Sequence, residues 1–216
     1  MKLLEEGWKN TEIARYMRET YGVSNEKTAL VITIANREKA LLQDLDYENG
    51  YSLYVGIPFC PSICLYCSFG SHPLERWTKR VDEYLDTLCK ELTFIREQMG
   101  ARKLTTVYIG GGTPTTLEPE QLRRLLSHIQ ETFDFTWVKE YTVEAGRPDS
   151  ITREKLQVMK EFPVTRISVN PQTMNQKTLD VIGRKHTVED TINIFHMARE
   201  LDFDNINMDL IIGLPG

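Results

Sequence analysis

From residue 51 onwards the chain alternates between short apolar runs and amphipathic stretches. The apolar runs predict strands at YSLYVGI (51–57), TVYIGG (106–111), EYTVEA (140–145), TRISVN (165–170) and NINMDLII (205–212). Between them, apolar residues recur every three or four positions, which predicts helices near 80–98, at 120–129, from Thr152, at 178–182 and at about 188–201. Because a parallel return needs a crossover, five strand–helix repeats in order predict an α/β fold with a parallel sheet.

Residues 1–46 show only helical patterns. One helix follows Asn10 and a second follows Ser24, with apolar positions at Ile13, Tyr16, Met17, Ala29, Leu30, Ile34 and Leu41. Two short helices around a glycine turn also suggest a DNA-binding pair. The segment carries 7 basic and 8 acidic residues, however, so it lacks the positive charge that nucleic acid requires. We therefore expect a helical N-terminal extension at 1–46 and a core domain at 47–216.

The last predicted strand is followed only by a Gly-Leu-Pro-Gly turn, which leaves its edge uncovered. Since an exposed sheet edge is a liability, we expect the chain to be a fragment of a longer protein, with a core incomplete at the C-terminus. No stretch approaches the roughly 18 apolar residues of a membrane span, and Glu5 and Glu6 argue against a secretory signal. We expect a cytoplasmic protein with no membrane or nucleic-acid partner.

Three of the four cysteines form the motif C-x3-C-x2-C at Cys60, Cys64 and Cys67, just after the first strand. This position lies at the carboxyl end of a parallel sheet, where such folds gather their ligands. Three thiolates on one loop can each take one iron of a [4Fe–4S] cluster, which leaves the fourth iron open for chemistry. A Cys₃His zinc site that includes His72 is the alternative, while Cys89 falls on an apolar helix face and is expected in the core.

Further candidate residues follow the later strands. The run from Gly110 to Pro114 follows the second strand, and its glycines allow the backbone to approach a ligand closely. Glu144 ends the third strand at the same rim, and Gln172 follows the fourth strand. Arg184 lies in the next loop, and Asp209 lies inside the fifth strand. Arg184 suits a two-pronged pairing with a carboxylate. By contrast, we expect Arg147 and Lys185 to be ordinary surface charges, with anion binding in a substrate pocket as the alternative.

The cysteine spacing after a first strand resembles the radical S-adenosylmethionine superfamily. The resemblance covers residues 51–216 and implies a partial (β/α)6-type barrel, truncated after the fifth strand. It implies two cofactors, a [4Fe–4S] cluster and S-adenosyl-L-methionine, and an electron donor such as flavodoxin or ferredoxin. In that family one electron from the cluster cleaves the sulfonium and releases a 5′-deoxyadenosyl radical.

Within the superfamily, the segments LYVGIPFC, YIGGGTPT, YTVEAGRPDS, RISVNPQT and NMDLIIGLPG resemble the oxygen-independent coproporphyrinogen III oxidase family. EAGRPDS together with ISVNPQTMN is most similar to its HemZ-type branch, the coproporphyrinogen dehydrogenases. The resemblance implies metal ligation by the three cysteines and places the cofactor contacts at Tyr54, Tyr66, Gly111, Gly112, Thr113, Glu144, Gln172, Arg184 and Asp209. No catalytic side chain is assigned beyond the cluster ligands.

The implied reaction is oxidative decarboxylation of two propionates of coproporphyrinogen III, a tetrapyrrole, to vinyl groups in haem biosynthesis. The chain departs from the best-known oxidases at Phe69, where they carry a fourth cysteine, and at Pro171, where they read Gly-Val-Gln. These departures put a second S-adenosylmethionine in doubt. The alternatives are a haem chaperone or carrier of the same fold, and a radical enzyme that acts on another tetrapyrrole.

Overall fold

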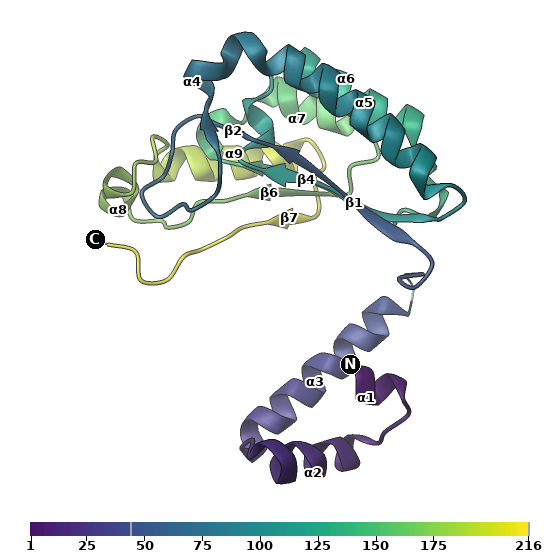
Figure 1. The fold of residues 1–216 in the computed structure, drawn as a ribbon. Coiled ribbons are helices and arrows are strands. Elements are labelled where there is room, and N and C mark those ends of the chain that lie inside the picture. Colours follow the sequence, from purple (N-terminus) through teal and green to yellow (C-terminus); the bar gives the residue numbers. More distant parts are fainter. Residues whose placement is uncertain (44, 216) are drawn as a thin grey trace. The chain divides into compact units, whose positions relative to one another are not determined.

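A computed structural model describes residues 1–43 and 45–215, and Figure 1 shows its fold. The chain divides into two compact units, Met1–Gly50 and Tyr51–Gly216. Each unit is described by itself. Within the described residues, no helix is long and apolar enough to cross a membrane.

The first unit consists of the helices α1 (Lys2–Glu5), α2 (Asn10–Tyr21) and α3 (Asn25–Leu42). Its small core contains Leu4, Ile13 and Ala35. Helix α3 begins where the sequence predicts, because the Ser24 side chain accepts a hydrogen bond from the Lys27 N–H.

Helix α3 turns a different face inward from the one its apolar residues predict. Its buried residues are Thr28 and Ala35, while Leu30, Ile34 and Leu41 are exposed. A polar contact lies on the observed face, where the Lys39 ammonium donates to the Leu4 carbonyl at 2.9 Å. Residues 28, 35 and 39 share one stripe of the helix.

The second unit is built on a five-stranded parallel sheet, which confirms the predicted α/β fold. Its strands are β1 (Tyr51–Ile57), β4 (Leu104–Gly111), β5 (Glu140–Gly146), β6 (Arg166–Val169) and β7 (Ile206–Asn207), in the spatial order β1-β4-β5-β6-β7. A separate parallel pair is formed by β2 (Phe59–Cys60) and β3 (His72–Pro73).

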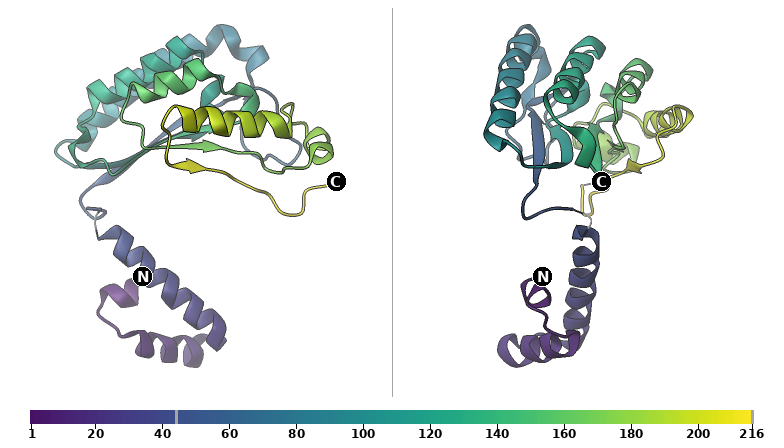
Figure 2. Two further views of the ribbon diagram at one scale, coloured as in Figure 1. Left: turned by 180° about the vertical axis from the view of Figure 1, so that it is seen from behind. Right: turned by 90° about the vertical axis from the view of Figure 1, so that its right-hand side faces the viewer.

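The helices of this unit are α4 (Leu74–Trp77), α5 (Val81–Met99), α6 (Pro119–Thr132), α7 (Arg153–Lys160), α8 (Gln176–Val181) and α9 (Val188–Glu200). Single 3₁₀ turns lie at Thr78–Arg80, Pro114–Thr116, Phe135–Trp137 and Pro148–Ser150. Helices α5, α6, α7 and α9 lie side by side on one face of the sheet (Figures 1 and 2). Strands added in sequence order with their helices on one face form the wall of a (β/α) barrel, whereas a doubly wound sheet carries helices on both faces.

The strand residues alternate between the two faces of the sheet. The side chains packed towards the helices are apolar and almost fully buried, and they include Val55, Ile57, Val107, Ile109, Tyr141, Val143, Ile167 and Val169. The alternate positions face away from the helices and are mostly polar: Tyr54, Tyr108, Glu144 and Ser168. The sheet therefore presents a polar face, which corresponds to the inside of a barrel.

The fifth strand is much shorter than the predicted 205–212. It covers Ile206–Asn207, and the pairing with β6 resumes only at a single bridge between Gln172 and Leu210. Two backbone features interrupt the ladder. Pro171 has no N–H to donate, and Gln172 adopts a φ of 64°, in the left-handed region. The turn Asn170–Thr173 thus interrupts the strand pairing that the apolar pattern predicts to be continuous.

A prediction concerns Tyr141, which is fully buried and whose hydroxyl has no hydrogen-bond partner among the described residues. Burial of this hydroxyl raises the pKa of Tyr141. We expect Tyr141→Phe to leave the free energy of unfolding unchanged or to raise it by about 1 kcal/mol, since it removes an unsatisfied polar group. Tyr141→Ala, the control, should cost about 3–5 kcal/mol through the cavity it leaves. Denaturant unfolding measures both, and a loss above 1 kcal/mol for Tyr141→Phe would reveal a partner for the hydroxyl.

Candidate active site

The three cysteines lie on one closed loop at the carboxyl end of β1. The loop begins at Cys60 in β2 and returns at His72 in β3, where the His72 N–H donates to the Pro58 carbonyl at 2.7 Å. The Cys67 N–H donates to the Cys64 carbonyl at 3.0 Å, which forms a tight turn between two of the cysteines. Cys64 is buried, whereas Cys60 and Cys67 are partly exposed.

The glycine turn after β4 packs directly against the start of this loop. The N–H groups of Gly112 and Thr113 donate to the carbonyls of Ile57 and Phe59, each at 2.7 Å. A Cβ atom on residue 112 would lie 2.6 Å from the Phe59 carbonyl oxygen and 3.0 Å from the Cys60 Sγ atom. Only glycine fits such an approach, so this glycine has a packing reason that is independent of any ligand. The Thr113 hydroxyl also donates to Cys60 Sγ at 3.5 Å.

The turn after α8 holds the middle of the cysteine loop from the opposite side. The Leu65 N–H donates to the Ile182 carbonyl at 3.0 Å, and Arg184 donates from Nη2 to the Tyr66 hydroxyl at 3.1 Å. Arg184 Nη1 donates to the Asn170 carbonyl at 2.8 Å. Two predicted site residues, Tyr66 and Arg184, are therefore in direct contact, although 118 positions separate them.

Arg147 is not the surface charge that we expected. Only 3% of the residue is exposed, and its guanidinium contacts the cysteine loop. Nη1 donates to the Ser62 carbonyl at 3.0 Å and to Ser62 Oγ at 2.9 Å, and it lies 3.7 Å from Cys64 Sγ. Nε and Nη2 bind Asp149 in two-pronged geometry at 2.9 and 2.6 Å. The Arg-Pro-Asp turn was the available signal, because it places the two charges two residues apart; Lys185 is exposed as expected.

A second polar cluster lies on the open face of the sheet. The rings of Tyr54 and Tyr108 stack with their centroids 5.8 Å apart, and Glu144 lies beside them on β5. Burial, followed by the negative charge of Asp209, raises the pKa of Glu144, while hydrogen bonds from the Gly111 N–H and the Tyr108 hydroxyl act in the opposite direction. Burial and the Glu144 charge together raise the pKa of Tyr108 to about 12. The phenol thus remains protonated and available as a donor.

Gln172 and Asp209 meet through their backbones. The Gln172 N–H donates to the Asp209 carbonyl at 3.0 Å, and the Asp209 carboxylate accepts a bond from the Asn207 amide at 2.8 Å. Asp209 is exposed and lies beyond the end of β7, not inside a strand as the sequence predicts. Its negative charge nevertheless helps to raise the pKa of Glu144 and that of Tyr108.

The residues have the chemistry of the implied cofactors, although the thiols do not converge. In the described part of the chain, no three Cys, His, Asp or Glu side chains are arranged to hold a metal ion. The donor set itself, three cysteines on one short loop, is that of a cluster with one open iron. Nearby, Asn170 Oδ1 and Arg184 Nε are buried with no partner among the described residues. Buried unpaired polar groups are costly, so this rim suits a polar ligand such as an amino acid moiety.

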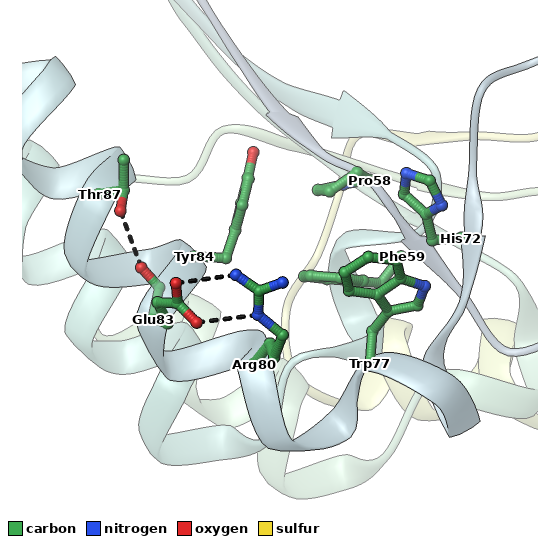
Figure 3. Close-up of a pocket in the computed structure, with 8 residues that line it drawn as sticks. All are labelled: Pro58, Phe59, His72, Trp77, Arg80, Glu83, Tyr84 and Thr87. Carbon is green, nitrogen blue, oxygen red and sulfur yellow. Dashed lines mark hydrogen bonds and ion pairs between the residues drawn. The ribbon is translucent and has the colours of Figure 1, made fainter.

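Two adjoining pockets flank the start of the cysteine loop. One, of about 400 Å³, lies between Tyr54, Gly111, Gly112 and the segment Phe69–Ser71, and so brings three predicted contact residues together. The other, of about 320 Å³, is shown in Figure 3 and is lined by Phe59, His72, Trp77, Arg80 and Tyr84. In this pocket the ring centroids of His72 and Trp77 are 5.0 Å apart. The Arg80 guanidinium donates two hydrogen bonds of 2.9 Å each to the Glu83 carboxylate.

His186 is a buried group near this site that the sequence pattern did not single out. It is 1% exposed, and neither ring nitrogen has a partner among the described residues. Burial, followed by the positive charge of Arg184, lowers the pKa of His186 to about 4. The imidazole is therefore neutral near pH 7 and adds no charge to the arginines beside it.

Comparison with known proteins identifies the class of this arrangement. Residues 54–216 match the model of the radical SAM superfamily, which covers most of the chain. The chain therefore belongs to the radical SAM superfamily, whose members use a [4Fe–4S] cluster and S-adenosylmethionine.

Individual relatives narrow the comparison. The chain is 42% identical, over all of its length and 44% of the relative's, to the "oxygen-independent coproporphyrinogen-III oxidase-like protein HemZ" of Bacillus subtilis (strain 168). It is also 42% identical to the "heme chaperone HemW" of the same organism, over 76% of this chain and 43% of that one. The structure of the coproporphyrinogen III oxidase HemN of Escherichia coli superposes with a TM-score of 0.71 and 31% identity, over 82% of this chain and 41% of that one. The chain thus spans less than half the length of the curated relatives it matches.

The close packing of Gly112 leads to a prediction. We expect Gly112→Ala to lower the free energy of unfolding by about 1–3 kcal/mol, because the new Cβ would overlap the Phe59 carbonyl and press on Cys60 Sγ. Gly70→Ala, on the neighbouring cysteine loop, is the control, since a Cβ there would meet nothing within 4 Å. Denaturant unfolding of both variants checks this, and equal stabilities would show that the glycine turn is not packed as described.

His186 leads to a prediction about pH. Its pKa in the folded protein lies below the ordinary 6.5, so the unfolded chain binds more protons between about pH 6.5 and 4. Stability should therefore fall through this window as the pH falls, by up to about 3 kcal/mol at about 1.4 kcal/mol per pKa unit. His186→Gln should remove that part of the pH dependence, while His196→Gln, at an exposed position on α9, should retain it. Parallel slopes for wild type and His186→Gln in unfolding experiments would contradict the prediction.

Proposed function

We propose that the protein carrying this chain is a radical S-adenosylmethionine enzyme that converts coproporphyrinogen III to protoporphyrinogen IX without oxygen. What supports this proposal is the extent of the match to the oxidase-like relative. That match takes in the whole chain, including the helical unit Met1–Gly50. The match to the haem chaperone covers 76% of the chain, which is too short to include both units entire.

In this proposal Cys60, Cys64 and Cys67 each hold one iron of the cluster, and the fourth iron is left for S-adenosylmethionine. Held by these residues, the cluster would supply the electron for reductive cleavage of the sulfonium of S-adenosylmethionine. The turn Gly111–Thr113, together with Tyr54, Tyr66, Glu144, Gln172, Arg184 and Asp209, binds and orients the cofactor. Arg184 and Tyr66 already contact one another, so they offer one joined polar surface to it.

The substrate change is an oxidation. At each of two propionates, the adenosyl group of the cofactor would accept one hydrogen atom from the carbon beside the ring and leave as 5′-deoxyadenosine. The substrate radical then loses CO2 and one electron, which passes to an acceptor, and a vinyl group remains. Each vinyl group thus consumes one S-adenosylmethionine and one reducing electron, which we assign to a donor such as flavodoxin or ferredoxin.

A haem chaperone is the second candidate function, because the 42% identity to HemW, over 166 residues, equals the 42% identity to the HemZ relative, over 219 residues. In a chaperone the same cluster loop would accompany haem binding without conversion of a porphyrinogen. A radical enzyme acting on another tetrapyrrole is distinguished by the mass of its product.

The test is anaerobic incubation of the full-length protein, with its cluster reconstituted, with coproporphyrinogen III, S-adenosylmethionine and a reductant. We expect protoporphyrinogen IX and 5′-deoxyadenosine in a ratio of about one to two. Deoxyadenosine without a vinyl product contradicts the proposal. Tight haem binding without turnover favours the chaperone.

A pair of cysteine variants controls this assay. Cys64→Ala should lose the cluster absorption and all turnover, since one iron loses its thiolate. Cys89→Ala should retain the cluster, because Cys89 lies on α5, with its side chain partly buried away from the cysteine loop. Iron content per chain measures both, and equal iron in the two variants would remove Cys64 from the ligand set.

A further inference from the structure

We propose that Arg147 is a positioning residue of the cluster, which holds the cysteine loop in place and makes the cluster easier to reduce through its donation to Cys64. This inference rests on the proposed function only in that Cys64 binds a cluster iron. It concerns a residue outside the cysteine motif, which would act on the cluster through Ser62 and Cys64.

The first support is the way in which Arg147 is held. It begins the turn after β5, and its side chain is 4% exposed. Two-pronged bonds to Asp149 fix the guanidinium plane, which leaves Nη1 to point at the cysteine loop. A guanidinium held by two parallel bonds has little freedom to turn, so its third contact is fixed in direction as well.

The second support is where Nη1 points. It donates to both the carbonyl and the hydroxyl of Ser62, the central part of the segment between Cys60 and Cys64. It also lies within hydrogen-bonding reach of Cys64 Sγ, at 3.7 Å. One cation therefore binds the backbone that spaces two ligands and the sulfur of one of them.

The third support is electrostatic. Reduction adds a negative charge to a cluster, and hydrogen bonds to its sulfurs together with local positive charge favour the reduced form. Cys64 is buried, so water screens this interaction weakly. Asp149 neutralises part of the positive charge of Arg147. Removal of the arginine charge should therefore make the reduction potential more negative, whereas removal of the aspartate charge should make it less negative.

The test is whether variants at Arg147 and Asp149 shift the reduction potential of the cluster in opposite directions. In the reconstituted full-length protein, Arg147→Gln should make reduction about tenfold less favourable, which is a shift of about 59 mV to a more negative potential for one electron. Asp149→Asn should shift the potential to a less negative value, because the arginine charge is then uncompensated. A redox titration followed by electron paramagnetic resonance measures both. Arg153→Gln, which loses an exposed ion pair with Glu200, is the matched control and should show no shift.

A second readout covers the loop itself. Iron loss to a chelator should be several times faster in Arg147→Gln than in the control, because Ser62 loses its two bonds. A role that is only structural predicts faster iron loss in both Arg147→Gln and Asp149→Asn, with shifts of the same sign or none, and that result overturns the proposal. If Arg147→Gln does not fold, Asp149→Asn and Arg147→Lys, which keeps the charge, decide by the direction of their shifts.

The outcomes separate this proposal from the proposed function. Wild-type protein that holds a cluster but forms no vinyl product overturns the oxidase assignment and leaves the potentials measurable. If the wild-type protein holds a cluster and the variants have the same reduction potential as the wild type, only the role of Arg147 is overturned. Wild-type protein that takes up no iron overturns both before any variant is compared.

Discussion

The close backbone contact between the glycine turn after β4 and the start of the cysteine loop is the constraint on which the site depends. Two short hydrogen bonds, from Gly112 to the last residue of β1 and from Thr113 to the first residue of β2, continue the pairing beyond the end of β4. No side chain fits between the two segments at Gly112. The cysteine loop is thereby fixed to the carboxyl edge of the sheet, and the remaining contacts act on a loop whose base is already placed.

Two arginines from distant loops then position the rest of the cysteine loop. Arg184 donates to the Tyr66 hydroxyl, in the segment between Cys64 and Cys67. Arg147 donates to the Ser62 carbonyl, in the segment between Cys60 and Cys64. Both are almost fully buried, and Asp149 is the single carboxylate bound to either of them among the described residues. A buried cation that lacks a full counterion is costly unless something negative completes its surroundings. In the proposed function, a thiolate-bound cluster and a carboxylate-bearing cofactor would supply negative charge at these two places.

The sequence predicts the frame of this site better than its internal contacts. The spacing of apolar residues predicts the strands and the helices, because burial on one or both faces of an element produces a regular pattern in the sequence. The parallel sheet follows from the order of these elements. The shortening of the fifth strand is different, since it depends on Pro171 and on the left-handed Gln172, which interrupt an apolar run. The burial of Arg147 likewise leaves no periodic trace. Its partners Ser62 and Cys64 are more than 80 positions away, and only the folded chain brings them together.

In the role proposed for it, Arg147 would influence the cluster without being one of its ligands. Hydrogen bonds and charges around an iron–sulfur cluster affect how readily it accepts an electron. Arg147 and Asp149 lie in the turn after β5, outside both motifs, so this turn can change without altering the ligands. The fold thus places a buried ion pair, Arg147 with Asp149, beside the cysteine loop and outside the cysteine motif.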